Sequence, residues 1–266
     1  MKKKLLSILL AATVIAGIFT GCGDKKDSAD KVESTNKETF VLGFDQEFPP
    51  MGFVGEDGEF TGFDIELGTE VAKRLDLKFV PQPIAWDAKD LELESGTIDC
   101  IWNGFTMTGR EDDYTFSKPY LENRQVFVVL ADSGIKTQAD LADKIVEVQA
   151  DSSAEVAMKE NTALSDTFKK LQAVPDYNTA MMDLEQGAVD AVAMDEVVAA
   201  FQIQSKEGVF VILDEEISAE EYAVGFLKGN DELKDKVDAT LKEMADDGTM
   251  AKISEKWFGK DITIFK

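Results

Sequence analysis

The stretch IWNGFTMTGREDD, residues 101–113, contains an apolar run that stops at Asn103 and Gly104 and is followed by a single arginine, Arg110. A second apolar run, in AMDEV at 193–197, ends on an acid, Asp195. Short apolar runs of this kind are typical of buried strands. Ligands of open α/β sheets bind beyond the carboxyl ends of the strands. We therefore expect a cation and an anion at two strand ends, where they can hold the two charges of a zwitterion.

Strand-like and helix-like patterns alternate on both sides of these runs. Strands are predicted at 40–44, 77–80, 98–102, 125–130, 145–148, 188–194 and 222–226, and helices at 64–75, 87–95, 153–159, 180–186, 196–205, 231–246 and 250–257. This alternation predicts an α/β fold with largely parallel sheets. Two α/β units are expected, near 40–130 and 131–222, and the tail, which has no strand set of its own, must pack on one of them.

Composition narrows the possible functions. The chain of 266 residues has 52 acidic and 28 basic side chains, and 44% of its residues are hydrophobic. A packed core and a solvated acidic surface are expected, whereas nucleic acid is an unsuitable partner because phosphate binding needs clustered Lys and Arg. The chain has no His, which excludes His-based triads and His metal sites. It also has no phosphate-binding loop, nucleophile-elbow motif or metal-ligand cluster, so we expect no cofactor and no metal.

The N-terminal segment reads as a signal peptide over residues 1–21. Lys2, Lys3 and Lys4 precede an uncharged run at 5–19 that is short for a transmembrane helix. Cys22 follows, in a pattern that resembles the lipobox of bacterial lipoproteins. An ordinary cleaved signal is the alternative, but it would leave an exposed unpaired thiol. We therefore expect an acylated (palmitate-type) Cys22, a flexible tether over 22–39, and anchoring at the extracytoplasmic face of the cell membrane. Cys100 lies in an apolar run and is expected to be buried.

Candidate ligand-binding groups follow several predicted strands. Arg110 offers a planar fork for a carboxylate, unless it pairs with Glu111 or Asp112. Thr106 is a neutral donor on the same turn, and Gly104 allows close approach of the backbone. The sequence DSSAE at 151–155 contains a capping box, and the helix N-terminus at Ser152 and Ser153 also favours an anion.

The opposite charge and the pocket walls have their own candidates. Asp195 is suited to an ammonium group, and its alternative role is the N-cap of helix 196–205. Phe48, Trp86 and Trp102 are aromatic side chains near strand ends, where they are either core residues or pocket walls. Asp45 and Glu47 are able to neutralise a cationic side chain or are simply loop residues.

The chain as a whole resembles the polar amino-acid-binding proteins of bacterial ABC importers, extracellular solute-binding proteins of family 3. The resemblance covers about 40–260 and rests on GFDQEFPPMGF (43–53), TGFDIELGTEVAKRL (61–75), GTIDCIWNGFTMTGR (96–110), FSKPY (116–120), VEVQADSSAE (146–155), GAVDAVAMDEVVAA (187–200), YAVGFLKGNDEL (222–233) and DGTMAKISEKWFG (247–259). It implies the type II fold of periplasmic binding proteins, with two lobes, each a mostly parallel sheet flanked by helices. Lobe 1 would be discontinuous, 40–129 plus 223–266, and lobe 2 would be 130–222.

The resemblance also implies a role for each candidate residue. Arg110, Thr106 and Ser153, with Ser152 beside them, would hold the α-carboxylate, and Asp195 with the backbone of Asn103 and Gly104 would hold the α-amino group. Phe48 and Trp86 would enclose the ligand side chain, and Gln149 and Met194 would line the specificity end. Two features depart from the family pattern. Arg110 comes two residues after Thr108 instead of three, and Asp151 replaces a glycine.

The resemblance implies a monomeric protein without enzyme activity that delivers a polar amino acid to an ABC transporter permease. The alternative is a dehydratase-like enzyme on the same fold that acts on prephenate or arogenate, with Glu47 as a candidate general acid. A docking or sensing module is a third possibility.

Overall fold

The computed structural model describes residues 38–266, and residues 37–266 form one compact unit. The predicted signal peptide, Cys22 and all but the last two residues of the predicted tether lie outside the described residues. Among the helices of the described part, none is both long enough and apolar enough to cross a membrane.

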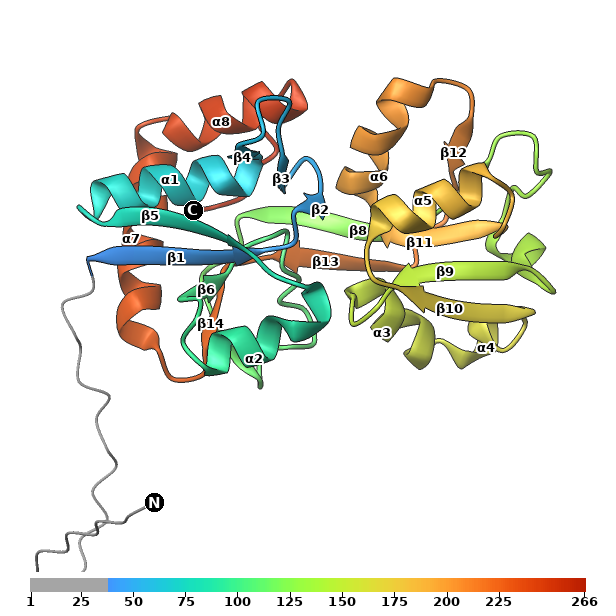
Figure 1. Cartoon of the computed structure of the whole chain (residues 1–266), viewed down its shortest axis with the longest axis horizontal. Coiled ribbons are helices and arrows are strands. Elements are labelled where there is room, and N and C mark those ends of the chain that lie inside the picture. Colours follow the sequence, from blue (N-terminus) through green and yellow to red (C-terminus); the bar gives the residue numbers. More distant parts are fainter. Residues whose placement is uncertain (1–37) are drawn as a thin grey trace, which may run out of the picture. The chain divides into compact units, whose positions relative to one another are not determined.

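The first lobe is built on a five-stranded sheet with the order β5-β1-β6-β14-β7 (Figure 1). Its strands are β1 (Thr39–Phe44), β5 (Lys78–Pro83), β6 (Cys100–Ile101), β7 (Tyr114–Phe116) and β14 (Gly225–Leu227). A small antiparallel sheet consists of β2 (Glu47–Phe48), β3 (Gly52–Val54) and β4 (Phe60–Thr61). The helices are α1 (Phe63–Arg74), α2 (Lys89–Glu94), α7 (Asp231–Asp246) and α8 (Thr249–Phe258), with a 3₁₀ turn at Trp86–Ala88. The C-terminal tail thus packs on the first lobe, through contacts of α7 and α8 with α1.

The second lobe is built on a sheet with the order β10-β9-β11-β8-β12, to which β13 is added through β8. Its strands are β8 (Leu121–Leu130), β9 (Ile145–Gln149), β10 (Lys170–Val174), β11 (Ala191–Asp195), β12 (Phe210–Ile212) and β13 (Ser218–Tyr222). Its helices are α3 (Ser153–Glu160), α4 (Thr162–Ser165), α5 (Tyr177–Glu185) and α6 (Glu196–Ile203), with 3₁₀ turns at Gln138–Leu141 and Gln204–Lys206. In Figure 1, α5 and α6 lie on one side of the sheet and α3 and α4 on the other.

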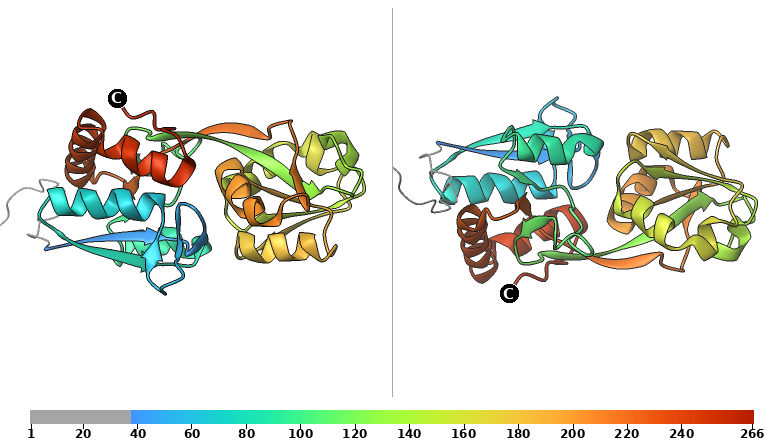
Figure 2. Two further views of the ribbon diagram at one scale, coloured as in Figure 1. Left: turned by 90° about the horizontal axis from the view of Figure 1, so that it is seen from above. Right: turned by 90° about the horizontal axis from the view of Figure 1, so that it is seen from below.

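Two strands connect the lobes. β8 and β13 pair antiparallel from Leu121↔Tyr222 to Gln125↔Ser218, and Figures 1 and 2 show them running side by side between the lobes. From Gln125 onward β8 also pairs with β11, and its last three residues pair with β12. The lobe boundaries after residues 129 and 222 stay a prediction. Residues 125–130 pair with strands of the second sheet, because the long strand β8 passes from the first lobe into the second.

The two-lobed α/β fold is confirmed, and its sheets are mixed. Parallel pairing is limited to three neighbouring strands in each sheet, β5-β1-β6 and β10-β9-β11. The remaining pairs are antiparallel, because β8 leaves the first lobe and β13 returns to it in the opposite direction. The predicted long helices at 64–75 and 231–246 are confirmed within two residues, whereas β7, β10, β12 and β13 were missed because their short segments carry little apolar periodicity.

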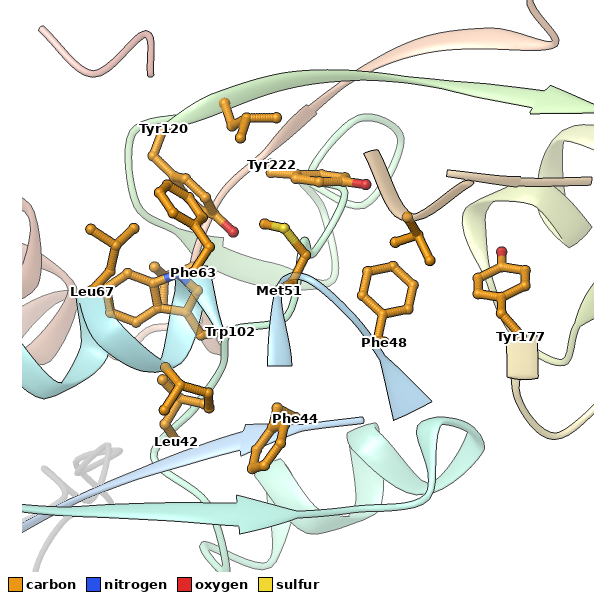
Figure 3. Packing of buried hydrophobic residues seen from close by; sticks show 14 of the residues in the cluster. Leu42, Phe44, Phe48, Met51, Phe63, Leu67, Trp102, Tyr120, Tyr177 and Tyr222 are labelled. Atoms are coloured by element: carbon orange, nitrogen blue, oxygen red, sulfur yellow. The ribbon is translucent and has the colours of Figure 1, made fainter. Parts of the chain in front are cut away.

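Buried aromatic side chains form much of the core of the first lobe. Trp102 is fully buried and packs against Tyr120, with ring centroids 6.1 Å apart. Figure 3 shows these two rings grouped with Phe63 and Leu67. Trp102 is therefore a core residue, which decides between the two roles considered for it. Cys100 is likewise fully buried, and burial raises the pKa of its thiol well above the usual range.

A buried acid from α1 fixes the turn that follows β6. Asp64 has no exposed surface, and its Oδ2 accepts hydrogen bonds from the Gly104 amide (2.6 Å) and from the Tyr120 hydroxyl (2.9 Å). Its Oδ1 has no hydrogen-bond partner among the residues that the structure describes. Burial raises the pKa of Asp64 to about 7. Asp64, the last residue of the GFD motif at 62–64, thus holds the turn at Gly104, which follows the carboxyl end of β6.

The raised pKa of Asp64 makes stability pH-dependent. A carboxyl group with a folded pKa above its unfolded value gives stability that is present below the unfolded pKa and is lost as pH rises through the folded pKa. Between pH 5 and pH 8, we expect the free energy of unfolding of the wild type to fall by on the order of 2–4 kcal/mol more than that of Asp64→Asn. Urea unfolding at both pH values measures this difference. The exposed Asp57→Asn serves as the control and should follow the wild type, and equal pH slopes for wild type and Asp64→Asn would contradict the prediction.

Gly62, the residue before α1, sits where a side chain does not fit. Its φ is 139°, and a Cβ atom there would lie 2.3 Å from the Met51 carbonyl oxygen. We expect Gly62→Ala to lower the free energy of unfolding by about 3 kcal/mol or more. Gly58 also has positive φ (82°) but open space around it, so Gly58→Ala should cost only about 1 kcal/mol. Similar losses in both variants, measured by urea denaturation, would show that conformational strain alone acts at Gly62.

Candidate functional site

Nine of the eleven predicted ligand-binding residues line one small cavity between the lobes. They come from β2, the 3₁₀ turn, the loop after β6, the end of β9, the start of α3 and the end of β11: Phe48, Trp86, Gly104, Thr106, Arg110, Gln149, Ser152, Ser153 and Asp195. Only about 10 Å³ of the cavity admits the centre of a water molecule. Access for a ligand of amino-acid size therefore requires the lobes to move apart.

Arg110 is half-buried and has no ion-pair partner within residues 38–266. Its Nη1 donates to the Thr106 carbonyl at 3.1 Å, and its guanidinium carbon lies 5.1 Å from the centre of the Phe105 ring. The alternative pairing with Glu111 or Asp112 is not formed. Because no acid neutralises it, the guanidinium retains donors for a carboxylate in the cavity.

The N-terminus of α3 faces the same cavity. The Ser152 hydroxyl caps the helix by accepting from the Glu155 amide at 3.1 Å, and the Glu155 carboxylate accepts from the Asp151 amide at 2.8 Å. Ser153, from the second lobe, lies 3.3 Å from the Thr106 hydroxyl of the first lobe. These two hydroxyls and the helix N-terminus supply neutral donors next to Arg110, which suits an anion.

Asp151, the acid at the position of the family glycine, is paired. It has a φ of 60°, and its carboxylate forms an ion pair with Lys89 of the first lobe, which is only 2% exposed. The Asp151 carbonyl accepts from the Trp86 indole at 3.2 Å. The acid thus does not leave an unpaired negative charge beside the proposed carboxylate site, and it also helps to fix Trp86.

Asp195 is buried at the end of β11, where three donors converge on its Oδ1. These are the Tyr222 hydroxyl (2.5 Å), Nε2 of Gln125 (2.7 Å) and Nδ2 of Asn123 (3.0 Å). Asp195 occupies the N-cap position of α6, but its side chain makes no capping hydrogen bond. Burial, followed by the negative charge of Glu220, raises the pKa of Asp195 to about 8. An ammonium group in the cavity would supply the missing positive charge.

Five residues near Asp195 were not predicted from the sequence: Asn123, Gln125, Tyr177, Glu220 and Tyr222. Four of them alternate on the two crossing strands, and Asn123 lies opposite Glu220 in the register. The sequence offers no alternation of polar and apolar residues here, because 121–125 reads LENRQ and 218–222 reads SAEEY, and the pairing of these segments is long-range. Tyr177 packs against Phe48 with ring centroids 5.8 Å apart (Figure 3), and its buried hydroxyl has no partner in the described part of the chain.

Gly104 has a φ of 55°, and the space beside it is filled. A Cβ atom there would lie 2.9 Å from the Tyr222 ring and 3.2 Å from the Phe48 ring. Only glycine combines this backbone conformation with such close aromatic neighbours. Trp86 packs edge-on against Phe105, with ring centroids 5.7 Å apart. The cavity therefore has two aromatic walls, Phe48 and Trp86, both held by neighbouring rings.

The other two predicted residues lie outside this cavity. Asn103 is buried beside Gly52, and its side-chain amide has no partner among the described residues. Asp45 is 5% exposed, and its Oδ2 accepts from Nε2 of Gln149 at 2.6 Å. Burial raises the pKa of Asp45 to about 6. Met194, expected at the specificity end, is fully buried and does not line the cavity.

Asp45 belongs to a neighbouring cavity of about 420 Å³, which we call the distal cavity. Its ten lining residues are Asp45, Gln46, Glu47, Pro83, Ile84, Ala85, Trp86, Asp87, Pro175 and Asp176. The two cavities share Trp86, and the bond between Gln149 and Asp45 joins them. Four of the ten residues are acids and none is a lysine or arginine. In residues 38–266, no cluster of three or more His, Cys, Asp or Glu is suited to a metal.

Comparisons with known proteins match this arrangement over nearly the whole chain. The model of bacterial extracellular solute-binding proteins, family 3, matches residues 40–260. The L-cystine-binding protein TcyJ of Escherichia coli (strain K12) is 31% identical, with 96% of this chain and 95% of TcyJ covered. The solved structure of Tv2483 bound to L-arginine has a TM-score of 0.82 and 32% identity, covering 86% and 94% of the two chains.

A second solved structure is a substrate-binding protein of an ABC uptake transporter from Streptococcus pneumoniae with bound histidine. It has a TM-score of 0.83 and 34% identity, covering 85% of this chain and 94% of its own. The family match, the two-lobed fold and the cavity between the lobes agree, and the chain belongs to the bacterial extracellular solute-binding proteins of family 3.

Proposed function

We propose that the protein captures a polar L-amino acid between its lobes and delivers it to the permease of an ABC transporter. The observation that carries this proposal is the single cavity that unites Arg110, without an acidic partner, and the buried Asp195. A zwitterionic head group complements these two residues, its carboxylate at Arg110 and the start of α3, and its ammonium at Asp195. A ligand in contact with both lobes favours the closed arrangement over the open one.

The chemistry of the distal cavity favours a cationic side chain. Asp45 is buried and has no Lys or Arg partner in the described part of the chain, and Glu47, Asp87 and Asp176 surround it. A buried carboxylate without a counter-charge is costly, and a ligand cation would remove that cost. The acids carry this preference, because the Trp86 ring already has a cation beside it, the Lys89 ammonium at 5.3 Å from the ring centre.

Of the three compared proteins, TcyJ is named for L-cystine, and the two solved structures hold L-arginine and histidine. Cystine has a second carboxylate, which would face the four acids of the distal cavity without a lysine or arginine to hold it. Arginine, lysine and ornithine place a cation there instead. We therefore propose basic amino acids as the substrate class, with arginine first because its planar guanidinium can bind several acids at once.

Anchoring and partners are part of the same proposal. Cys22 would carry the lipid, the segment up to residue 39 would act as the tether, and a monomer would work at the extracytoplasmic face of the membrane. The N-terminal sequence pattern supports this proposal, and metabolic labelling with a palmitate analogue, compared between wild type and Cys22→Ala, tests it.

The geometry of the central cavity does not favour the dehydratase alternative. Glu47, the acid considered for that reaction, lines the distal cavity and accepts a hydrogen bond from Asn178, and it is not among the residues of the central cavity. Incubation with prephenate and arogenate checks this alternative, and we expect no product.

The decisive experiment is calorimetric titration of residues 38–266, refolded once to remove carried-over ligand. The panel contains the twenty amino acids, ornithine and cystine. We expect micromolar or tighter binding of arginine, lysine or ornithine and much weaker binding of aspartate and glutamate. No binding of any amino acid would overturn the proposed function, and tight binding of cystine alone would overturn the substrate class.

Arg110→Ala and Asp195→Ala should each weaken binding of the preferred amino acid by about 2–5 kcal/mol, because each leaves a desolvated ligand charge without its partner. Arg74→Ala, which removes an arginine bound to Glu70 and Asp247 on the surface, should leave affinity unchanged. Titration calorimetry measures the three variants, and wild-type affinity in both site variants would refute the site.

Asp45→Asn should weaken arginine binding about 10–100-fold but change glutamine binding by less than about threefold, because only the cation loses its counter-charge. In the wild type, arginine affinity should also fall as pH drops through about 6, where Asp45 takes up a proton. Asp57→Asn, on the exposed hairpin between β3 and β4, is the matched control. Equal losses for arginine and glutamine would assign Asp45 a structural role.

A further inference from the structure

Glu220, from the strand β13, places a second buried carboxyl group beside Asp195. Glu220 is only 6% exposed. The Nδ2 atom of Asn123 donates to both acids, at 2.5 Å to Glu220 and 3.0 Å to Asp195. The Nε2 atom of Gln125 also contacts both, at 2.8 Å and 2.7 Å. The two carboxyl groups are thus neighbours bridged by the same two amides.

This pair has no counter-charge of its own. Within residues 38–266, neither Asp195 nor Glu220 forms an ion pair with a lysine or arginine. Two adjacent buried carboxylates repel each other, and without a cation the pair is most stable when it holds one proton. Two further observations indicate that a polar ligand group completes the cluster. The buried Oε1 of Gln125 and the buried hydroxyl of Tyr177 have no hydrogen-bond partner in the described chain.

We propose that Asp195 and Glu220 share one proton before the ligand binds and release it when the α-ammonium group of the ligand enters. The ammonium supplies the positive charge that the proton had supplied. The O–H bond of one carboxyl group breaks, both carboxylates become ionised, and the proton passes to the solvent. The inference rests on the proposed function, since it concerns the amine end of that site. Glu220 acts as a positioning residue that sets the protonation of Asp195.

The surroundings of the pair fit this role. The other titratable or charged groups around Asp195 are Tyr222 from β13, Tyr177 from α5, Arg110 from the loop after β6, and the ion pair between Arg124 of β8 and Glu196 of α6. On the side of Glu220, the acids Glu122, Glu216 and Glu221 line an open pocket with it, and Arg110 lines a second pocket with it. Burial raises the pKa of both tyrosines well above the usual range, so they stay neutral. Arg110 is reserved for the ligand carboxylate, and Arg124 is neutralised by Glu196. Only the ligand is left to compensate the carboxyl pair.

The sign of the pH dependence follows from the pKa of Asp195, which is raised to about 8. At pH 7 the pair is protonated before binding and deprotonated afterwards, so one proton leaves for each ligand bound. Affinity should therefore rise about fivefold between pH 7 and pH 8 and level off above that range. Asp45 titrates near pH 6 and contributes little in this window.

The test is titration of the protein with L-arginine at pH 7.0, 7.5, 8.0 and 8.5, each in two buffers of different ionisation enthalpy. The difference in apparent binding enthalpy counts the protons released. We expect close to one proton at pH 7.0 and a progressive decline toward pH 8.5. Binding without proton release at pH 7.0 overturns the inference and leaves the proposed function intact. If arginine does not bind, the panel member that binds replaces it, and failure of the whole panel overturns both.

The variant Glu220→Gln measures the contribution of Glu220 to proton release separately from that of Asp195. We expect the variant to bind arginine, with the midpoint of proton release about one pH unit or more lower, because the neighbouring charge is gone. Glu122→Gln removes an exposed acid from the facing strand β8 and should reproduce the wild-type profile. A Glu220→Gln profile that superimposes on the wild type refutes the role of Glu220. The wild-type measurement decides the proton release even where this variant does not fold.

Discussion

The antiparallel pairing of β8 and β13 is the constraint on which the rest of the molecule depends. These strands connect the lobes, and they also carry Asn123, Gln125, Glu220 and Tyr222, which surround Asp195. The joint between the lobes and the support of the proposed amine site are thus the same piece of structure. Any change in the angle between the lobes acts on strands that contact Asp195, so ligand recognition and lobe movement are physically linked.

The lobes meet through two aromatic pairs, Phe48 with Tyr177 and Phe53 with Phe201, and through several polar contacts. The polar contacts include the ion pair of Lys89 with Asp151, and the hydrogen bonds of Trp86 with Asp151, Gln149 with Asp45, Thr106 with Ser153 and Asn178 with Glu47. Water can replace polar contacts at modest cost when the lobes separate, whereas a large apolar interface would oppose opening. An interface of this kind leaves the balance between open and closed arrangements to be set by a ligand that bridges the lobes.

Charge is distributed unevenly along the proposed binding path. One end has Arg110 and neutral hydroxyls, and the other has buried acids, Asp195 with Glu220 and Asp45 with its neighbours. Burial raises the pKa of Asp195 and of Asp45, so each carries an unfavourable charge in the folded protein at high pH. This cost makes the ligand-free protein less stable. Ligand cations relieve it, so the site is selective for positively charged groups.

The sequence by itself determined the family, the two α/β units, the long helices and nine residues that the fold brings into one cavity. The elements and the charged candidates follow from local patterns: the apolar period of α1, the glycine turn at Gly104, the cap at Ser152 and the charges that end strands. The family and the place of Gln149 follow from the resemblance to known sequences. The tertiary structure decided which acids are buried together. Glu220 and Asp195 are neighbours because β13 returns beside β8. The negative charge of Asp151 is neutralised because Lys89 of the other lobe forms an ion pair with it. Such pairings join residues far apart in the chain, and local periodicity carries no information about them.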